Sequence, residues 1–276
     1  MNPMIRTWKI YKKDIEEVPI ADGASLDAIT RLLPDGYYST FRTYAECTRV
    51  IGLSAHLRRL PEVDAPFLRR LLTQLLEPFR PQEARVRVMM TFSGEVYVSA
   101  EPLKVLPREI YKKGVRVETT SIQRVDPRTK STAFIGQSEE ERAHIAQKGI
   151  FEALLVKNGR ILEGMTSNFF YILRPSESSR SAHGGICTAH RDILPGVTRR
   201  TVIRVARERG IEVKYKSLKL DKLPAVNEAF ITSSSRGIVP VVQIDNVVVG
   251  ECRIGDVTKQ LSEAYESYVI QKAERI

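Results

Sequence analysis

Hydrophobic and polar residues alternate over many short stretches of the chain, which is the pattern of half-buried β-strands. Residues 85–92 and 95–100 alternate on either side of Ser93-Gly94, so we predict a hairpin there. A second hairpin is predicted around Asn158-Gly159, because Asn-Gly is a strong signal for a two-residue turn. Further strands are predicted at residues 37–44, 114–121, 153–156, 160–162, 168–173, 211–218, 228–232 and 241–249.

Other segments repeat their hydrophobic residues every three or four positions, as amphipathic helices do. Residues 66–79 have this spacing, and Ser54 is expected to cap a short helix over residues 55–60. Pro195-Gly196 opens a helix that ends at Gly210. Helices are also predicted at residues 138–147 and from about residue 256 onward, whereas residues 175–190 are rich in Ser, Gly and His and predict a loop.

Strands and helices are mixed along the whole chain, and no internal repeat is visible. This mixture favours the α+β class, with two mixed α/β domains. We predict a small N-terminal domain over residues 1–107 and a larger C-terminal domain over residues 112–276. Sites for small molecules are common between domains, so we expect the active site there.

The composition narrows the class of protein. The chain has 276 residues, is 42% hydrophobic and contains three cysteines without a CxxC or Cys/His cluster, so we expect no metal site and a reduced, cytoplasmic setting. It lacks a run of about eighteen apolar residues and an N-terminal secretory pattern, so no membrane span is expected. The net charge of +10 fits a solvated basic surface or anionic small-molecule partners. Nucleic acid is not an expected partner, because the basic residues are dispersed and do not interleave with aromatic residues.

Lys130 and Glu163 are the candidate reactive residues. Lys130 lies in a loop between a predicted strand and a predicted helix, and Glu163 follows a hairpin strand and precedes Gly164. Each alone could be an ordinary surface residue. Together they offer an amine that can form an imine and a carboxylate that can keep a pyridine nitrogen protonated, which are the groups that pyridoxal 5'-phosphate (PLP) chemistry requires.

Anion-binding candidates occur in the same chain. Thr198 lies in Leu-Pro-Gly-Val-Thr-Arg at residues 194–199, where the N-terminus of a helix could bind a phosphate. The run Thr-Ser-Ser-Ser-Arg-Gly at residues 232–237 ends a strand and is either a plain turn or a second wall of the same site. Arg59 is a candidate for a phosphate contact, whereas His56 is expected to be structural.

Taken together, these segments resemble the class IV (fold-type IV) PLP-dependent enzymes, a family that includes branched-chain aminotransferases, D-amino acid aminotransferases and 4-amino-4-deoxychorismate lyases. The resemblance covers residues 37–265 and implies two domains with the cofactor between them, in a homodimer. Its motifs are His-Leu-Arg-Arg-Leu at 56–60, the lysine loop, Glu-Ala-Leu-Leu at 152–155, Glu-Gly-Met-Thr-Ser-Asn at 163–168, Leu-Pro-Gly-Val-Thr-Arg at 194–199, Asn-Glu-Ala-Phe-Ile-Thr at 227–232 and Ile-Val-Pro-Val at 238–241.

The resemblance also implies a role for each candidate residue. Lys130 would carry the cofactor and transfer the proton, and Glu163 would pair with the pyridine nitrogen. Tyr38 would line the substrate pocket, and the backbone at Ser234 and Ser235 would meet the substrate carboxylate. The phosphate would be held by Arg59, the amides of Val197 and Thr198, and Ser234.

Two positions depart from the branched-chain subgroup. Ile135 stands where a tyrosine is common, five residues after the lysine, and Ser39 stands where a glutamate is often found. The sequence therefore predicts a PLP-dependent aminotransferase acting on a small amino acid, with a branched-chain type favoured, and a 2-oxo acid. The alternatives are a lyase that releases pyruvate from 4-amino-4-deoxychorismate and a non-catalytic basic binding protein on the same fold. The substrate side chain and its stereochemistry are left open.

Overall fold

The computed structural model describes residues 5–12, 14–174 and 185–276, and the chain divides into two compact units. Unit 1 consists of Met1–Val105, Thr129–Gln137 and Val269–Ile276, and unit 2 consists of Leu106–Arg128 and Ser138–Tyr268. The segment that carries Lys130 therefore belongs to unit 1, although the chain on both sides of it belongs to unit 2. The division into domains over residues 1–107 and 112–276 stays a prediction.

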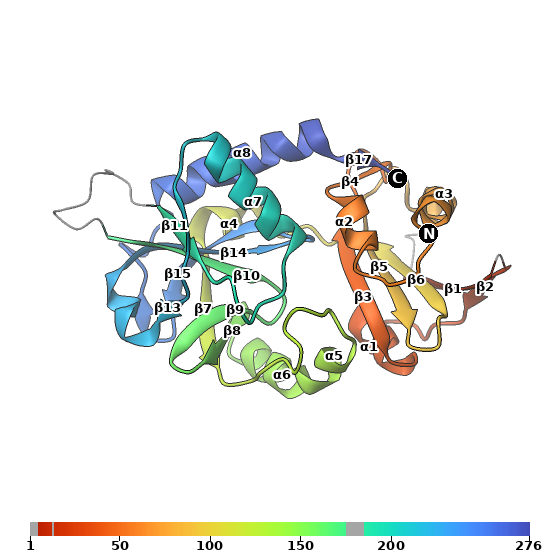
Figure 1. The fold of residues 1–276 in the computed structure, drawn as a ribbon, viewed down its shortest axis with the longest axis horizontal. Coiled ribbons are helices and arrows are strands. Elements are labelled where there is room, and N and C mark those ends of the chain that lie inside the picture. Colours follow the sequence, from red (N-terminus) through yellow and green to blue (C-terminus); the bar gives the residue numbers. More distant parts are fainter. Residues whose placement is uncertain (1–4, 13, 175–184) are drawn as a thin grey trace. The chain divides into compact units, whose positions relative to one another are not determined.

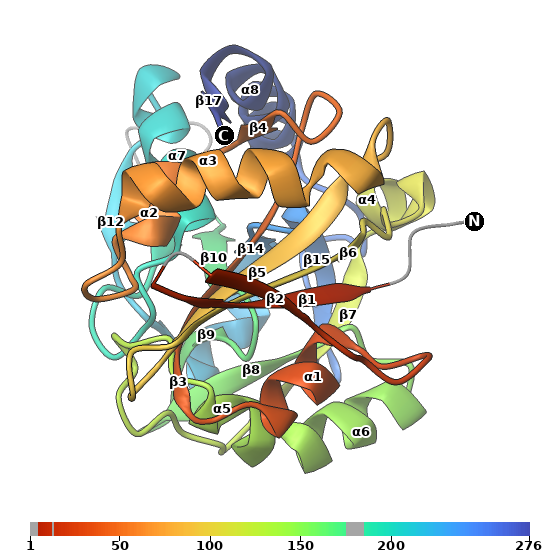
Figure 2. The same cartoon turned by 90° about the vertical axis from the view of Figure 1, so that its right-hand side faces the viewer.

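Unit 1 is built on a five-stranded antiparallel sheet with the order β2-β1-β6-β5-β3 (Figure 2). The predicted hairpin around Ser93-Gly94 is confirmed as the β5–β6 pair. The sheet strands are β1 (Arg6–Tyr11), β2 (Asp14–Val18), β3 (Gly36–Arg42), β5 (Ala84–Thr91) and β6 (Val96–Pro102). The other elements are α1 (Leu26–Leu32), β4 (Arg49–Val50), α2 (Leu53–Leu57), α3 (Ala65–Leu75), η1 (Glu77–Phe79), α5 (Ala133–Gln137) and β17 (Glu274–Arg275).

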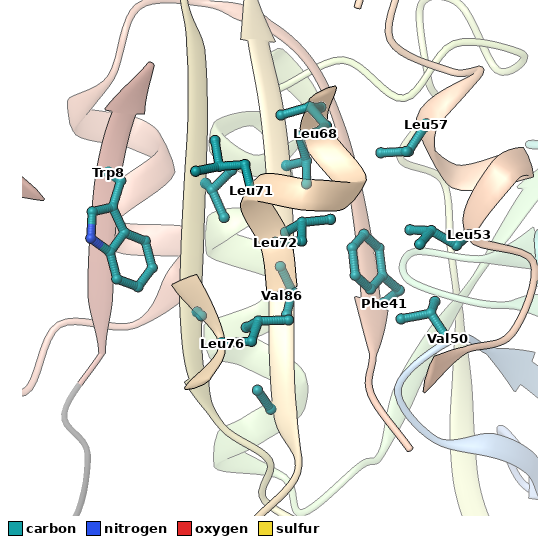
Figure 3. Packing of buried hydrophobic residues seen from close by; sticks show 14 of the residues in the cluster. Trp8, Phe41, Val50, Leu53, Leu57, Leu68, Leu71, Leu72, Leu76 and Val86 are labelled. Carbon is teal, nitrogen blue, oxygen red and sulfur yellow. The ribbon is translucent and has the colours of Figure 1, made fainter. Parts of the chain in front are cut away.

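The core of unit 1 lies between α3 and one face of this sheet. Figure 3 shows Leu68, Leu71 and Leu72 of α3 in the same buried cluster as Phe41 of β3 and Val86 of β5. The side chain of Asp64 caps α3 by accepting a hydrogen bond from the amide of Phe67 at 2.9 Å. The helix ends earlier than predicted, because Pro78 has no amide to continue it and only a short 3-10 turn follows.

The prediction that Ser54 caps a helix is wrong. The cap position of α2 is Gly52, which has the left-handed φ of 64° that favours glycine. Ser54 instead donates from its amide and hydroxyl to Glu274 at 3.1 and 2.6 Å, and Arg69 donates to the same carboxylate at 2.5 Å. Burial alone would raise the pKa of Glu274, but the hydrogen bonds from Ser54 and Arg69 outweigh it and the pKa is lowered.

Unit 2 contains a ten-stranded mixed sheet (Figure 1). Pairing runs from β10 through β14, β15, β7, β8 and β9, and a β9–β10 pair at Asn168 and Glu163 closes this run of strands into a ring. The strands are β7 (Val115–Thr120), β8 (Glu152–Lys157), β9 (Arg160–Gly164), β10 (Asn168–Leu173), β11 (Ile186–Thr188), β12 (Val213–Tyr215), β13 (Leu218–Lys219), β14 (Val226–Ser233), β15 (Gly237–Ile244) and β16 (Val247–Val248). The helices are α4 (Arg108–Lys113), α6 (Glu139–Gln147), α7 (Val197–Glu208), η2 (Leu220–Ala225) and α8 (Asp256–Lys272), whose last residues belong to unit 1.

Some predicted elements of unit 2 are confirmed, and others differ from the prediction. The Asn158-Gly159 hairpin joins β8 to β9. The predicted strand over residues 211–218 is two separate strands, β12 and β13. Of the predicted loop over residues 175–190, residues 175–184 lie outside the described part, and residues 186–188 form β11. Within the described residues, no helix has the length and apolar character needed to cross a membrane.

Candidate active site

Lys130 is held on the sheet of unit 1 by a short stretch of strand-like pairing. The amide of Tyr38 donates to the carbonyl oxygen of Lys130 at 2.9 Å, and Ser131 forms an isolated antiparallel bridge with Tyr37. The half-buried Lys130 places its Nζ atom over the Tyr38 ring, 4.8 Å from the ring centroid. The structure therefore brings together two residues that the sequence indicates for the site, the lysine and the pocket tyrosine.

Tyr38 is itself fixed in a buried environment. Its ring is 5% exposed and belongs to an apolar cluster with Met89, Tyr97 and Ile135. The guanidinium of the buried Arg87 also lies over the ring, 4.7 Å from its centroid, where a cation–π contact is favourable. Arg87 forms an ion pair with Asp27 at 2.7 Å, so its position is fixed in turn by α1.

The other unit 1 candidates lie at α2. His56 is fully buried, with its Nδ1 atom 2.8 Å from the hydroxyl of Ser39, and its ring packs on Phe41. These contacts are those of a structural histidine. Arg59 follows α2 and is half-buried. Its contact with a phosphate stays a prediction.

Glu163 is the centre of the candidate site in unit 2. It is 1% exposed, and its carboxylate accepts hydrogen bonds from Asn168 Nδ2 at 2.9 Å and from the amide of Leu194 at 3.0 Å. Arg124 Nε donates to the other carboxylate oxygen at 3.1 Å, in an ion pair whose side chains are 5% and 2% exposed. The guanidinium stabilises the negative charge of a carboxylate that is otherwise shielded from water.

The N-terminus of α7 lies beside this carboxylate. Asn168 Nδ2 also donates to the carbonyl oxygen of Leu194 at 2.9 Å, which joins β10 to the segment before the helix. Gly196 is required here, because a Cβ atom at this position would lie 1.9 Å from Asn168 Oδ1. Thr198, in the first turn, has its hydroxyl 3.3 Å from that of Ser234. Two predicted phosphate contacts from distant parts of the sequence therefore meet at a helix N-terminus, which suits an anion.

Arg236 anchors the turn between β14 and β15, which contains Ser234 and Ser235. Its guanidinium donates to Glu152 at 3.1 Å and to the hydroxyl of Thr166 at 2.6 Å, and Nε donates to Ser233 Oγ at 3.0 Å. Glu152 is 2% exposed, so this is a second buried carboxylate with an arginine partner. The contacts connect the turn to the residues just before Asn168.

Arg199 adds a second buried cation near Glu163. It is 5% exposed and donates to the carbonyl oxygen of Ala189 at 2.7 Å and to Thr188 Oγ1 at 3.3 Å. Burial lowers the pKa of Arg199, while the charges of Tyr215 and Glu163 act in the opposite direction. The described residues contain no group of three or more His, Cys, Asp or Glu side chains that could hold a metal ion.

Comparison with known families shows which family the chain belongs to. The model of the family described as "Amino-transferase class IV" matches residues 39–244. The chain belongs to the class IV aminotransferases. The matched residues begin directly after Tyr38 and include Lys130, Glu163 and Arg236.

Two similar proteins are named as branched-chain-amino-acid aminotransferases. A Methanocaldococcus jannaschii protein named "Putative branched-chain-amino-acid aminotransferase" is 28% identical over 264 residues, which are 85% of this chain and 87% of that protein. The Escherichia coli (strain K12) branched-chain-amino-acid aminotransferase is 31% identical over 63% of this chain and 56% of its own length. The fold is similar to that of an aminotransferase from Brucella abortus solved with bound PLP, with a TM-score of 0.71, 22% identity, and 95% and 99% of the two chains covered.

PLP is the cofactor of this class IV aminotransferase, and the donors of unit 2 fit it. A buried carboxylate suits a protonated pyridine nitrogen, and two hydroxyls at a helix N-terminus suit a phosphate. Thr232 adds a further observation. Its Oγ1 atom is buried and has no hydrogen-bond partner among the described residues, and it pairs across the sheet with Asn168, which pairs with Glu163. Paired residues share a face of the sheet, so the Thr232 hydroxyl and the Glu163 carboxylate lie on the same face, with Asn168 between them.

Some residues of the candidate site are not apparent from the sequence. Arg124 is not among the candidates that the sequence indicates, and its partner Glu163 lies 39 positions away. Asn168 ends a motif without a role of its own. Glu152 and Arg236 form an ion pair across 84 positions, and neither carries a local signal of burial. These residues meet only because distant strands pair in the sheet of unit 2, and the sequence alone does not give that pairing.

Proposed function

We propose that this aminotransferase exchanges the amino group of a small branched-chain amino acid with a 2-oxo acid, with Lys130 as the covalent attachment point of PLP. The names of its relatives support the substrate class. The observation that carries the site assignment is the buried ion pair of Arg124 and Glu163 beside the N-terminus of α7. Tyr38, whose ring the Lys130 amine contacts, is proposed to line the substrate pocket.

Unit 2 binds and polarises the cofactor in this proposal. Glu163 holds the pyridine nitrogen, while the amides of Val197 and Thr198 and the Ser234 hydroxyl hold the phosphate, together with Arg59 of unit 1. When bound, PLP supplies an electron sink for the charge that develops at the substrate Cα atom. Arg124 holds the Glu163 carboxylate in place through their ion pair. The backbone at Ser235 binds the substrate carboxylate.

Unit 1 supplies the group that moves the proton. Once the substrate amino group has replaced it on the cofactor, the freed Lys130 Nζ would take the proton from the substrate Cα atom and pass it on to the cofactor side of the transferred nitrogen. This role requires a fixed position of the amine. The contact of Lys130 Nζ with the Tyr38 ring supports such a position. We expect the enzyme to act in the cytoplasm as a homodimer.

Two measurements test the proposal. Borohydride reduction of the PLP-loaded protein, followed by peptide mapping, should place the label on Lys130. Lys130→Ala should abolish the near-visible absorption band of bound PLP, whereas Lys148→Ala, at an exposed lysine paired with Glu118, should not. Label on another lysine would refute the assignment.

The substrate class is tested by a half-reaction. The PLP form is mixed with leucine, valine, glutamate or D-alanine without an acceptor. We expect branched-chain amino acids to remove the near-visible band, and a 2-oxo acid to restore it. If no amino acid changes the spectrum and pyruvate is released from 4-amino-4-deoxychorismate, the lyase alternative replaces the proposal.

A further inference from the structure

The lysine segment, Thr129–Gln137, is joined to unit 1 by a short stretch of backbone pairing. The chain leaves unit 2 after Arg128 and returns to it at Ser138. Between these points, the amide of Tyr38 donates to the carbonyl oxygen of Lys130 and the amide of Thr132 donates to that of Gly36, each at 2.9 Å. An isolated bridge of this length is far shorter than a regular strand pair. The position of Lys130 therefore depends on additional contacts.

Thr132 provides these contacts through its hydroxyl. Thr132 Oγ1 accepts a hydrogen bond from the amide of Gly36 at 3.0 Å and donates one to Asp35 Oδ1 at 2.7 Å. A hydroxyl can donate and accept at once, which neither a carbonyl nor an alkyl group can do. Thr132 is 5% exposed, so water cannot readily replace either bond.

The partners of Thr132 are themselves closely packed. A Cβ atom at Gly36 would lie 2.0 Å from the carbonyl oxygen of Met90, so the start of β3 is pressed directly against β5. On the other side, the carbonyl oxygen of Thr132 accepts from the amide of Ile135 at 2.8 Å, and Ile135 packs in the cluster that contains Tyr38. Thr132 therefore links the backbone of the lysine segment to the same rigid sheet that carries Tyr38.

We propose that Thr132, with Asp35 as its acceptor, is a positioning residue that holds Lys130 at its reactive position over Tyr38. The inference rests on the proposed role of Lys130. The residue acts through the backbone two positions away and does not itself contact substrate or cofactor. Loss of its hydroxyl should therefore affect the steps that use the lysine amine more than the binding of substrate.

Four variants of the full-length protein test this inference. Thr132→Val keeps the side-chain shape and removes both hydrogen bonds, Thr132→Ser keeps the hydroxyl, and Asp35→Asn keeps an acceptor oxygen. Thr7→Val is the matched control, because Thr7 is buried in the same sheet and its hydroxyl bonds to Ser99 at 2.9 Å. For each, we would measure Tm, kcat and KM, and the rate at which the near-visible band appears when PLP is added to the apoprotein.

We expect Thr132→Val to lower kcat and the rate of band appearance by roughly tenfold or more, with KM changed less than about twofold. Thr132→Ser and Asp35→Asn should stay within about threefold of wild type, and Thr7→Val should lower Tm without slowing either step. The inference is overturned if Thr132→Val matches wild type, or if Thr7→Val loses as much activity. Borohydride mapping of the wild type separates the two failures: label away from Lys130 refutes the proposed function, whereas label on Lys130 with a fully active Thr132→Val refutes only the role of Thr132.

Discussion

Glu163→Gln removes one negative charge from a buried site while the side chain keeps nearly the same volume. In the wild type, one carboxylate oxygen accepts from Asn168 and Leu194, and the other accepts from Arg124. Glutamine offers only one oxygen, so its NH₂ group must face a donor. If the oxygen stays with the two neutral donors, Arg124 is left buried without the counter-ion at 3.1 Å.

The magnitude of both effects follows from this geometry. Removing one partner of a buried ion pair typically costs about 3–5 kcal/mol, so we expect the free energy of unfolding to fall by about 3 kcal/mol. A hydrogen bond to a charged group contributes about 1.5–3 kcal/mol, and about 1.4 kcal/mol is a tenfold change in rate. We therefore expect kcat to fall by roughly 10- to 100-fold, with PLP still bound through its phosphate.

The assay needs a control for stability. Glu228→Gln is suitable, because Glu228 is also buried and its carboxylate accepts bonds from the amides of Val257 and Thr258 at the start of α8. Chemical denaturation should show a loss of stability for both variants. Steady-state kinetics at saturating PLP should show a loss of kcat for Glu163→Gln alone. Turnover of Glu163→Gln within a few-fold of wild type would refute the reasoning about the pyridine nitrogen.

Three further changes test other parts of the molecule. Arg59→Ala should weaken PLP affinity in a fluorescence titration more than it changes kcat at saturating PLP. A phosphate contact far from the reacting bonds stabilises the ground state and the transition state equally. Unchanged PLP affinity with a collapsed kcat would contradict the phosphate contact of Arg59. Arg236→Met should raise KM for the amino acid, and it should lower stability because Glu152 loses its cationic partner. Adding Glu152→Gln should restore stability but not KM. A normal KM in both variants would exclude a role for the turn that carries Ser234 and Ser235. Glu274→Gln should lower Tm at pH 7, because the folded-state pKa of Glu274 is below its unfolded value of about 4.3 and its contribution is present above that value. That contribution is lost as the pH falls below about 4, so the Tm of the wild type and that of Glu274→Gln should converge there. A constant Tm difference across the pH range would be evidence against the ionised carboxylate as the source of the stabilisation.

Local patterns in the sequence determined most of the elements and the chemical class of the site. The turns at Ser93-Gly94 and Asn158-Gly159 depend on neighbouring residues, so both hairpins follow from the sequence alone. The motifs around Lys130 and Glu163 likewise indicated PLP chemistry, and the family match agrees with it. Helix ends do not follow from local patterns alone. Ser54 has the chemistry of a cap, but its hydroxyl bonds instead to Glu274, which lies 220 positions further along the chain.

Tertiary structure decided which partners these residues have. Glu163 depends on Arg124, and the hydroxyls of Thr198 and Ser234 meet across 36 positions. Lys130 joins the sheet of unit 1 although the chain on both sides of its segment, Thr129–Gln137, lies in unit 2. Such contacts arise from the pairing of distant strands and from burial, where an unpaired charge or hydroxyl is costly. The sequence shows which residues can make these bonds, and the fold determines which of them do.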